Sequence, residues 1–229
     1  MSAVALTAPL HREDVLHFLG YRGLGTPRAR TDEALGSVLE EARALVAPRG
    51  IHRCVPPDCA QVLGLESRRR GTTLALGLVT IGFDLERRVT ELIAQGETTR
   101  ALLLDAAGSA AAEEAADDLE RRIHGGAWRA DRGHARRTAR RVSPGYGTWP
   151  ITAQRALFDL LPHGEIQVEL LPSCLMTPRK SVSFAIWIGE REARGAGPGD
   201  AAGSEGQVAR CALCDMPTCP YREGSGTPE

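Results

Sequence analysis

The chain has 229 residues, of which 42% are hydrophobic and 25% charged, and a formal net charge of −1 at pH 7. This composition excludes a chain that is disordered throughout, and the length suits one large domain. A net charge this close to zero gives no general attraction to nucleic acid or to an anionic membrane. The longest apolar stretch, near residues 73–81, is too short to cross a bilayer, and the N-terminus lacks a signal-peptide pattern. We therefore expect a cytoplasmic protein without membrane or nucleic-acid partners.

Apolar periodicity predicts the order of the elements. Helices are expected over 12–19, 31–45, 85–94, 101–123 and 150–161, and strands over 72–81, 165–171 and 181–188. Thr31 is the expected N-cap of the second helix, and Gly108 and Ser109 are expected to interrupt or begin the fourth. The strand expected at 165–171 has an apolar residue at every second position, and the one at 181–188 places Val182, Phe184, Ile186 and Ile188 on one face, so we expect the two to pair in antiparallel fashion. Helices first, then strands mixed with helices, predict an α+β fold.

Three parts of the chain differ in composition. Residues 1–190 are expected to form the folded domain, and residues 191–207 are a flexible linker because they are rich in Gly, Ala and Ser. Residues 208–229 form a cysteine-containing tail. Within the domain, the long helix carries the acidic residues Glu113, Glu114, Asp117 and Asp118, which we expect to form a solvated surface.

The segment with the most chemical information is 141–147, with the sequence RVSPGYG. Arg141 supplies a fixed cation with a fork of donors. Ser143 and Pro144 lead into Gly145, where backbone can approach a ligand closely because the residue has no side chain. Tyr146 supplies a flat aromatic surface. The alternative interpretation is an ordinary Pro-Gly turn in which Tyr146 packs into the core.

This segment resembles the Arg-x-x-x-Gly-Tyr segment of the cobalamin-dependent methionine synthase activation domain family, in its stand-alone form. A downstream stretch, residues 170–183, is similar to a second family segment, and residues 15–23 and 104–109 show weaker similarity. The resemblance therefore extends over about residues 10–190 and is strongest between Arg141 and Ser183. It implies an antiparallel sheet with flanking helices.

The resemblance also implies a ligand and a reaction. It assigns S-adenosylmethionine to Arg141, Ser143, Pro144, Gly145 and Tyr146, with the arginine meeting the ligand carboxylate and the tyrosine stacking on the ligand or lying near its sulfonium. The reaction it implies is methyl transfer to cobalamin after one-electron reduction, usually by a flavodoxin-like donor. Positioning accounts for such catalysis, so no side chain of this chain is expected to be catalytic.

The cobalamin is expected to arrive on a partner protein. The sequence contains no Asp-x-His-x-x-Gly cobalamin motif, because Val15 stands where the Asp before His17 is required. The partner implied is a cobalamin-binding methionine synthase subunit or another corrinoid protein. On this interpretation the chain is a component of an enzyme system more than a complete enzyme.

The sequence leaves two alternative functions open. An independent S-adenosylmethionine-dependent methyltransferase would act without any corrinoid, and the absence of a Gly-rich strand-turn-helix motif argues against it. A metal-binding adaptor protein is the second alternative, against which the intact segment 141–147 argues.

A basic run of Arg and His residues precedes the segment, between Arg132 and Arg141. It can dock an acidic electron donor or the corrinoid protein, because complementary charge steers encounter and orientation. The alternative interpretation is an ordinary solvated surface.

Six cysteines in a chain without an export signal are expected to be thiols, metal ligands or redox groups. Cys211, Cys214 and Cys219 have Cys-x2-Cys-x4-Cys spacing, and a tetrahedral sulfur site would need a fourth ligand, for which Cys174 is the first candidate. Zinc would stabilise the tail, whereas an iron–sulfur cluster could carry an electron. Free thiols or a redox disulfide are the alternative. Cys54 and Cys59, the next candidates, are expected to be structural or incidental.

Overall fold

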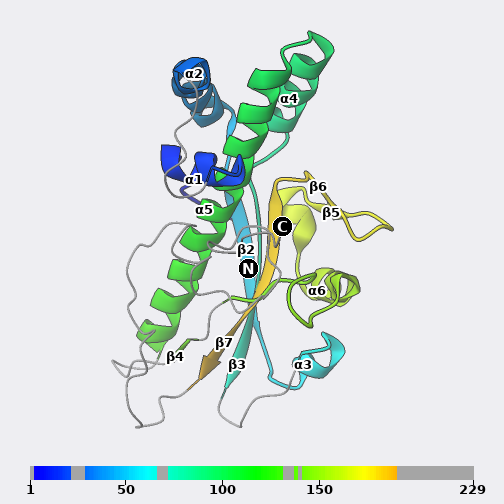
Figure 1. The fold of residues 1–229 in the computed structure, drawn as a ribbon. Helices are drawn as coiled ribbons and strands as arrows, with labels where there is room; N and C mark the ends of the chain where they lie inside the picture. Colours follow the sequence, from blue (N-terminus) through cyan, green and yellow to red (C-terminus); the bar gives the residue numbers. More distant parts are fainter. Residues whose placement is uncertain (1–2, 22–28, 66–71, 131–136, 139–140, 190–229) are drawn as a thin grey trace, which may run out of the picture. The chain divides into compact units, whose positions relative to one another are not determined.

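The computed structural model describes residues 3–21, 29–65, 72–130, 137–138 and 141–189 (Figure 1). The chain divides into two compact units, each described by itself below. Among the described residues, the sheet unit comprises 3–8, 47–65, 72–83, 112–130, 137–138 and 141–189, and the helical unit comprises 9–21, 29–46 and 84–111. The expectation that residues 1–190 form one domain stays a prediction. The expected linker 191–207 and tail 208–229 lie outside the described residues.

The sheet unit is built on a five-stranded antiparallel sheet with the strand order β1-β2-β3-β7-β4. Its strands are β1 (Val4–Ala5), β2 (Arg49–Val55), β3 (Thr73–Thr80), β7 (Ser181–Gly189) and β4 (Arg137–Thr138). The longest pairing joins β3 to β7, with Gly77 opposite Phe184. Helices flank this sheet, so the predicted α+β fold with an antiparallel sheet and flanking helices is confirmed.

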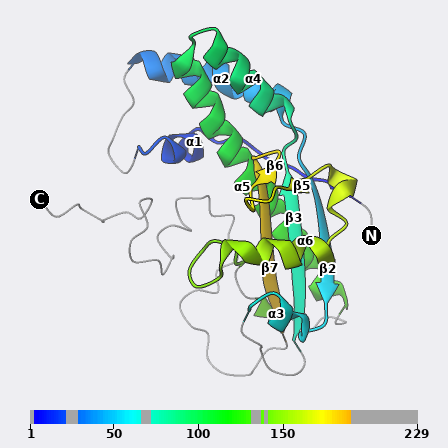
Figure 2. The same cartoon turned by 90° about the vertical axis from the view of Figure 1, so that its right-hand side faces the viewer.

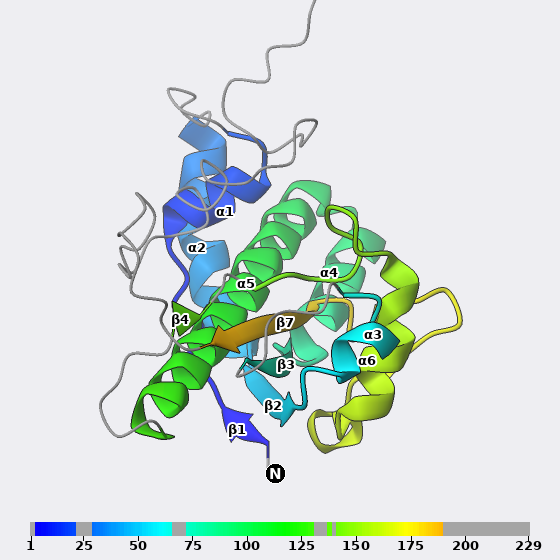
Figure 3. The ribbon, with the colours of Figure 1, turned by 90° about the horizontal axis from the view of Figure 1, so that it is seen from below.

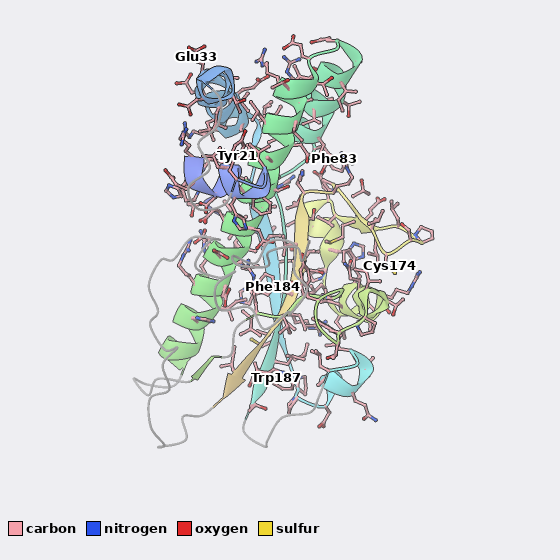
Figure 4. The ribbon with its side chains drawn as sticks, in the orientation of Figure 1. Tyr21, Glu33, Phe83, Cys174, Phe184 and Trp187 are labelled. Carbon is pink, nitrogen blue, oxygen red and sulfur yellow. The ribbon has the colours of Figure 1, made fainter. Side chains whose placement is uncertain are left out.

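Both faces of the central strands are buried. Phe184, Ile186 and Ile188 of β7 pack against the second part of α5 (Thr98–Ala130), as the predicted one-face alternation requires. Ala185 and Trp187 pack in a second cluster with residues of α3 (Cys59–Val62) and α6 (Gln154–Leu160). The helices α5 and α6 accordingly lie on opposite faces of the sheet (Figure 3), and Phe184 and Trp187 are marked in Figure 4. Because water reaches neither face, β3 needs an almost continuous apolar sequence.

The predicted pairing between 165–171 and 181–188 is wrong. Residues His163–Ile166 form the 3-10 helix η2, and Gln167 has a left-handed φ of +57°, which prevents one long strand. Only β5 (Glu169–Leu170) remains extended, and it pairs with β6 (Met176–Thr177) in a separate two-stranded sheet. The predicted helix at 150–161 is present as η1 (Ile151–Ala153) and α6, which crosses the sheet in Figure 2.

The helical unit contains α1 (Arg12–Phe18), α2 (Ala29–Leu45), α4 (Asp84–Ala94) and the first part of α5. These helices confirm the predicted ones, with two corrections. Helix α2 begins at Ala29, so Thr31 is not its cap, and α5 continues through Gly108 and Ser109 without a break. One glycine costs about 1 kcal/mol in a helix, which packing outweighs. None of the described helices is long and apolar enough to cross a membrane.

Glu41 of α2 connects three helices within the helical unit. Its two carboxylate oxygens each accept a hydrogen bond of 2.7 Å, one from Arg88 of α4 and the other from Arg100 of α5. Burial acts to raise the pKa of Glu41, but the two arginines outweigh it, so the pKa lies below its usual value. These ion pairs join α2, α4 and α5 within the helical unit.

The expectation of a solvated acidic surface on α5 is wrong for Asp117 and Asp118, which are 4% and 9% exposed. The helix presents these carboxylates to cations and N–H donors of the sheet unit. Thr7 N–H donates to Asp118 over 2.8 Å, and Arg122 donates to the same carboxylate over 2.8 Å. Hydrogen bonds of this kind offset the cost of burying a charge.

We expect Asp118 to make stability depend on acidity. Burial acts to raise its pKa, but the bonds from Thr7 and Arg122 outweigh burial and hold the pKa below its usual value of 3.8. The folded protein thus holds this proton less tightly than the unfolded chain, so the stabilisation is complete above pH 3.8 and is lost as the pH falls through the folded-state pKa. Urea unfolding at several pH values should show the difference between the parent and Asp118→Asn shrinking below pH 3.8. A difference that stays constant down to acid unfolding would contradict this.

Candidate functional site

The segment 141–149 belongs to the sheet unit. It first runs beside β7 and then forms a tight turn. Val142 is joined to Ala185 of β7 by two backbone hydrogen bonds of 2.9 and 2.8 Å. The turn then closes on itself, because Gly145 N–H donates to the Trp149 carbonyl over 2.8 Å. Trp149 is 5% exposed, and its indole N–H donates to the Leu63 carbonyl over 2.6 Å. A bridge to β7 and a buried tryptophan therefore hold the two ends of the turn.

Between these ends the turn is exposed. Gly145 has a φ of +92°, a backbone conformation that side chains strongly disfavour, and a Cβ placed there would lie 3.2 Å from Ile151 Cδ1. Tyr146 is 65% exposed and Ile151 is 42% exposed. The alternative in which Tyr146 packs into the core is therefore wrong. An exposed aromatic ring beside bare backbone is suited to binding a flat ligand with polar edges.

Ser143 and Pro144 form the entry to the turn. The Ser143 carbonyl accepts a hydrogen bond of 3.2 Å from Tyr146 N–H, and Pro144 is buried. These two residues thus contribute backbone geometry, and the structure brings them together with Gly145 and Tyr146 in one turn, as the sequence pattern requires.

Arg141 is surrounded by carboxylates of α5. Its Nη2 atom contacts Glu113 and its Nη1 atom contacts Asp117, and Glu120 lies 3.6 Å from Nη1. The arginine side chain is only 11% exposed. Burial acts to lower the pKa of Arg141, but the three carboxylates outweigh it, so the pKa is raised and the guanidinium stays charged. The terminal nitrogens of this cation contact the protein's own acids, and its predicted contact with a ligand carboxylate stays a prediction.

Sequence reasoning missed these partners. Glu113, Asp117 and Glu120 are separated by four and three residues, which places them on one stripe of a helix. Such a stripe of acids, in a chain with an arginine in a candidate binding motif, is the signal that could have indicated the ion-pair set.

The predicted metal site cannot be assembled from the described residues. Cys211, Cys214 and Cys219 lie outside them, as does most of the basic run between Arg132 and Arg141. Cys174 is described, is 3% exposed and follows β5 in a turn where its φ is +64°. Within the described ranges, no three residues of the His, Cys, Asp and Glu types are grouped to hold a metal ion.

Comparison with known proteins connects the fold to a family. The model of a family described as vitamin B12 dependent methionine synthase, activation domain, matches residues 65–195, which is more than half of the chain. Among solved structures, the crystal structure of the MetH reactivation domain bound to AdoHcy is similar in fold, with a TM-score of 0.58 and 14% identity over 85% of this chain and 80% of that chain. A search of curated proteins found no match. The chain therefore belongs to the family of vitamin B12-dependent methionine synthase activation domains.

Proposed function

We propose that the chain binds S-adenosylmethionine at the turn 143–146 and serves the reductive methylation of cobalamin carried by another protein. The observation that carries this proposal is an exposed Gly145-Tyr146 turn, held at both ends, in a chain of the activation-domain family. A MetH reactivation domain of similar fold has been crystallised with AdoHcy, the product that S-adenosylmethionine becomes after it loses its methyl group.

The residues of the turn fit the chemistry of this ligand. Gly145 leaves its backbone open to the ligand, and the Tyr146 ring can stack on the adenine or lie near the sulfonium. Ser143 and Pro144 hold the backbone that leads to these groups, and Arg141 is the cation of the same segment. When bound, S-adenosylmethionine supplies an activated methyl group, and the turn's task is to hold and orient it.

The partner we propose is a cobalamin-binding methionine synthase subunit or another corrinoid protein. The family name supports a vitamin B12-dependent system, and the 229 residues contain no Asp-x-His-x-x-Gly motif with which to bind cobalamin themselves. A flavodoxin-like protein is the proposed electron donor.

Replacing Tyr146 by alanine should weaken ligand binding without unfolding the protein, because the residue is 65% exposed. We expect the dissociation constant for S-adenosylmethionine to rise about tenfold or more, equivalent to roughly 1.4 kcal/mol of lost stacking. Titration calorimetry with the full chain measures this directly.

Val62→Ala is the matched control, because Val62 is 72% exposed in α3 of the same unit and is not part of the turn. Its affinity should equal that of the parent. A parent protein that binds neither S-adenosylmethionine nor S-adenosylhomocysteine would contradict the proposed function. If Tyr146→Ala and the parent bind the ligand equally well, the turn is not part of the binding site.

A further inference from the structure

The backbone of Trp149 closes the turn that carries the proposed site. Its carbonyl accepts a hydrogen bond of 2.8 Å from Gly145 N–H, and its own N–H donates to the Tyr146 carbonyl over 3.1 Å. Both main-chain polar groups of Trp149 are thus bonded to the two residues that would meet the ligand. A displacement of Trp149 would therefore change how Gly145 and Tyr146 are presented.

The indole of Trp149 connects this turn to the end of α3. Leu63 directly follows α3, and the N–H groups of Gly64 and Leu65 donate back to carbonyls of the helix over 3.1 and 2.8 Å. This pattern of helix ending leaves the Leu63 carbonyl available, and it accepts the indole N–H of Trp149 over 2.6 Å. One side-chain hydrogen bond thereby joins two segments that are 86 residues apart.

The point to which the indole is bonded lies in the core. Leu63 is 1% exposed and belongs to the same buried cluster as Trp149 and as Leu74 and Leu76 of β3. Tyr146, at the other end of this connection, is 65% exposed. Close packing holds the core residues in place, so the indole bond relates the exposed tip of the turn to a fixed position in the sheet unit.

We propose that Trp149 is a positioning residue of the ligand site: its indole bond to the Leu63 carbonyl holds Gly145 and Tyr146 in the conformation that binds the ligand, while the indole itself lies in the core. This inference rests on the proposed function, because it concerns the same turn. A turn held in this way loses little conformational freedom when it binds, which favours affinity.

The first test needs no ligand. Trp149→Phe keeps a buried aromatic ring but removes the N–H donor, and we expect the amide hydrogen of Gly145 to exchange about tenfold faster because the turn opens more often. Trp187→Phe is the matched control, since Trp187 lies on β7 in the same cluster, is 6% exposed and is not part of the turn. Equal acceleration in both variants, or none in Trp149→Phe, would overturn the proposal.

The second test is titration calorimetry with S-adenosylmethionine and S-adenosylhomocysteine. A turn that is less often in its binding conformation weakens both ligands by the same factor, so Trp149→Phe should raise both dissociation constants about fivefold or more. Trp187→Phe should bind both ligands as the parent does. Unchanged binding by Trp149→Phe would overturn the proposal, and so would a loss confined to S-adenosylmethionine, which would indicate direct contact between the indole and the sulfonium.

A substitution after α3 tests the same connection from its other end. Gly64 has a left-handed φ of +68°, so Gly64→Ala strains the backbone beside the Leu63 carbonyl. It should weaken binding in the parent but add nothing in Trp149→Phe, because both changes break one connection. Gly96→Ala is the matched control, since Gly96 follows α4 in the same way with a φ of +78°. Additive losses from the changes at 64 and 149 would contradict the proposal.

These tests separate this inference from the proposed function. If the parent binds neither ligand, the proposed function fails, whereas the exchange rate of Gly145 still decides whether the indole bond holds the turn. If Trp149→Phe does not fold, Gly64→Ala carries both the exchange and the binding measurements, and an unchanged exchange rate with unchanged affinity would then overturn the proposal.

Discussion

Arg141→Met should lower the free energy of unfolding by about 3–5 kcal/mol, because removing one partner of a buried ion pair leaves charge without compensation. The arginine is 11% exposed, and its loss would leave Glu113, Asp117 and Glu120 facing one another without their shared cation. The cation–π contact with Phe184 would also disappear. Urea unfolding of the full chain, followed by far-ultraviolet circular dichroism at neutral pH, measures the loss.

Arg121→Met is the control for this substitution. Arg121 also pairs with an acid of α5, but its side chain is 53% exposed and lies 3.7 Å from Asp118. Exposed ion pairs contribute about 0–1 kcal/mol, so this variant should unfold almost as the parent does. If the loss of unfolding free energy in Arg141→Met is as small as the loss in Arg121→Met, the contacts of Arg141 are as weak as those of a surface pair.

The central strands were predictable because their environment leaves a simple pattern. Strand β3 is apolar along nearly its whole length, and in β7 the residues Phe184, Ile186 and Ile188 recur at every second position. Burial on two faces produces the first pattern, and packing against one helix produces the second. The local sequence pattern is therefore enough to predict both strands.

Strand β2 was not predicted because its sequence, RGIHRCV, lacks such a pattern. Only Ile51 and Val55 bury apolar side chains among its residues, and Arg53 and Cys54 are exposed. Its conformation depends on pairing with β3 over seven residue pairs, from Arg49 with Thr80 to Val55 with Leu74. Such pairing is a long-range interaction, which the intrinsic strand propensities of the residues do not reflect.

The candidate site was predictable to a similar, limited extent. The segment 141–147 pointed to a turn, and the structure contains that turn with Tyr146 exposed. The surroundings of Arg141 were not predicted, because its partners precede it by 21 to 28 residues on α5. A helix with many acids looks solvated until the element that covers it is known.

Gly77→Ala should be the most disruptive small substitution in the sheet unit. A Cβ at this position would lie 2.3 Å from Cζ of Phe184, and Phe184 is fully buried. The ring must then leave its place or the strands must separate, which we expect to cost about 3 kcal/mol or more. Because the same ring lies 5.8 Å from the guanidinium of Arg141, the variant should also weaken ligand binding at the turn. Urea unfolding and titration calorimetry measure the two effects.

Two further variants make this prediction specific to the glycine–phenylalanine contact. Gly36→Ala in α2 adds the same methyl group where no atom lies within 4 Å, and it should be neutral or stabilising by up to about 1 kcal/mol. In a background of Phe184→Leu, which removes the ring, Gly77→Ala should cost much less than in the parent, because contacting residues are not additive. An equal cost in both backgrounds would mean that the ring does not impose glycine at residue 77, and would also weaken the case that Phe184 connects the sheet to Arg141.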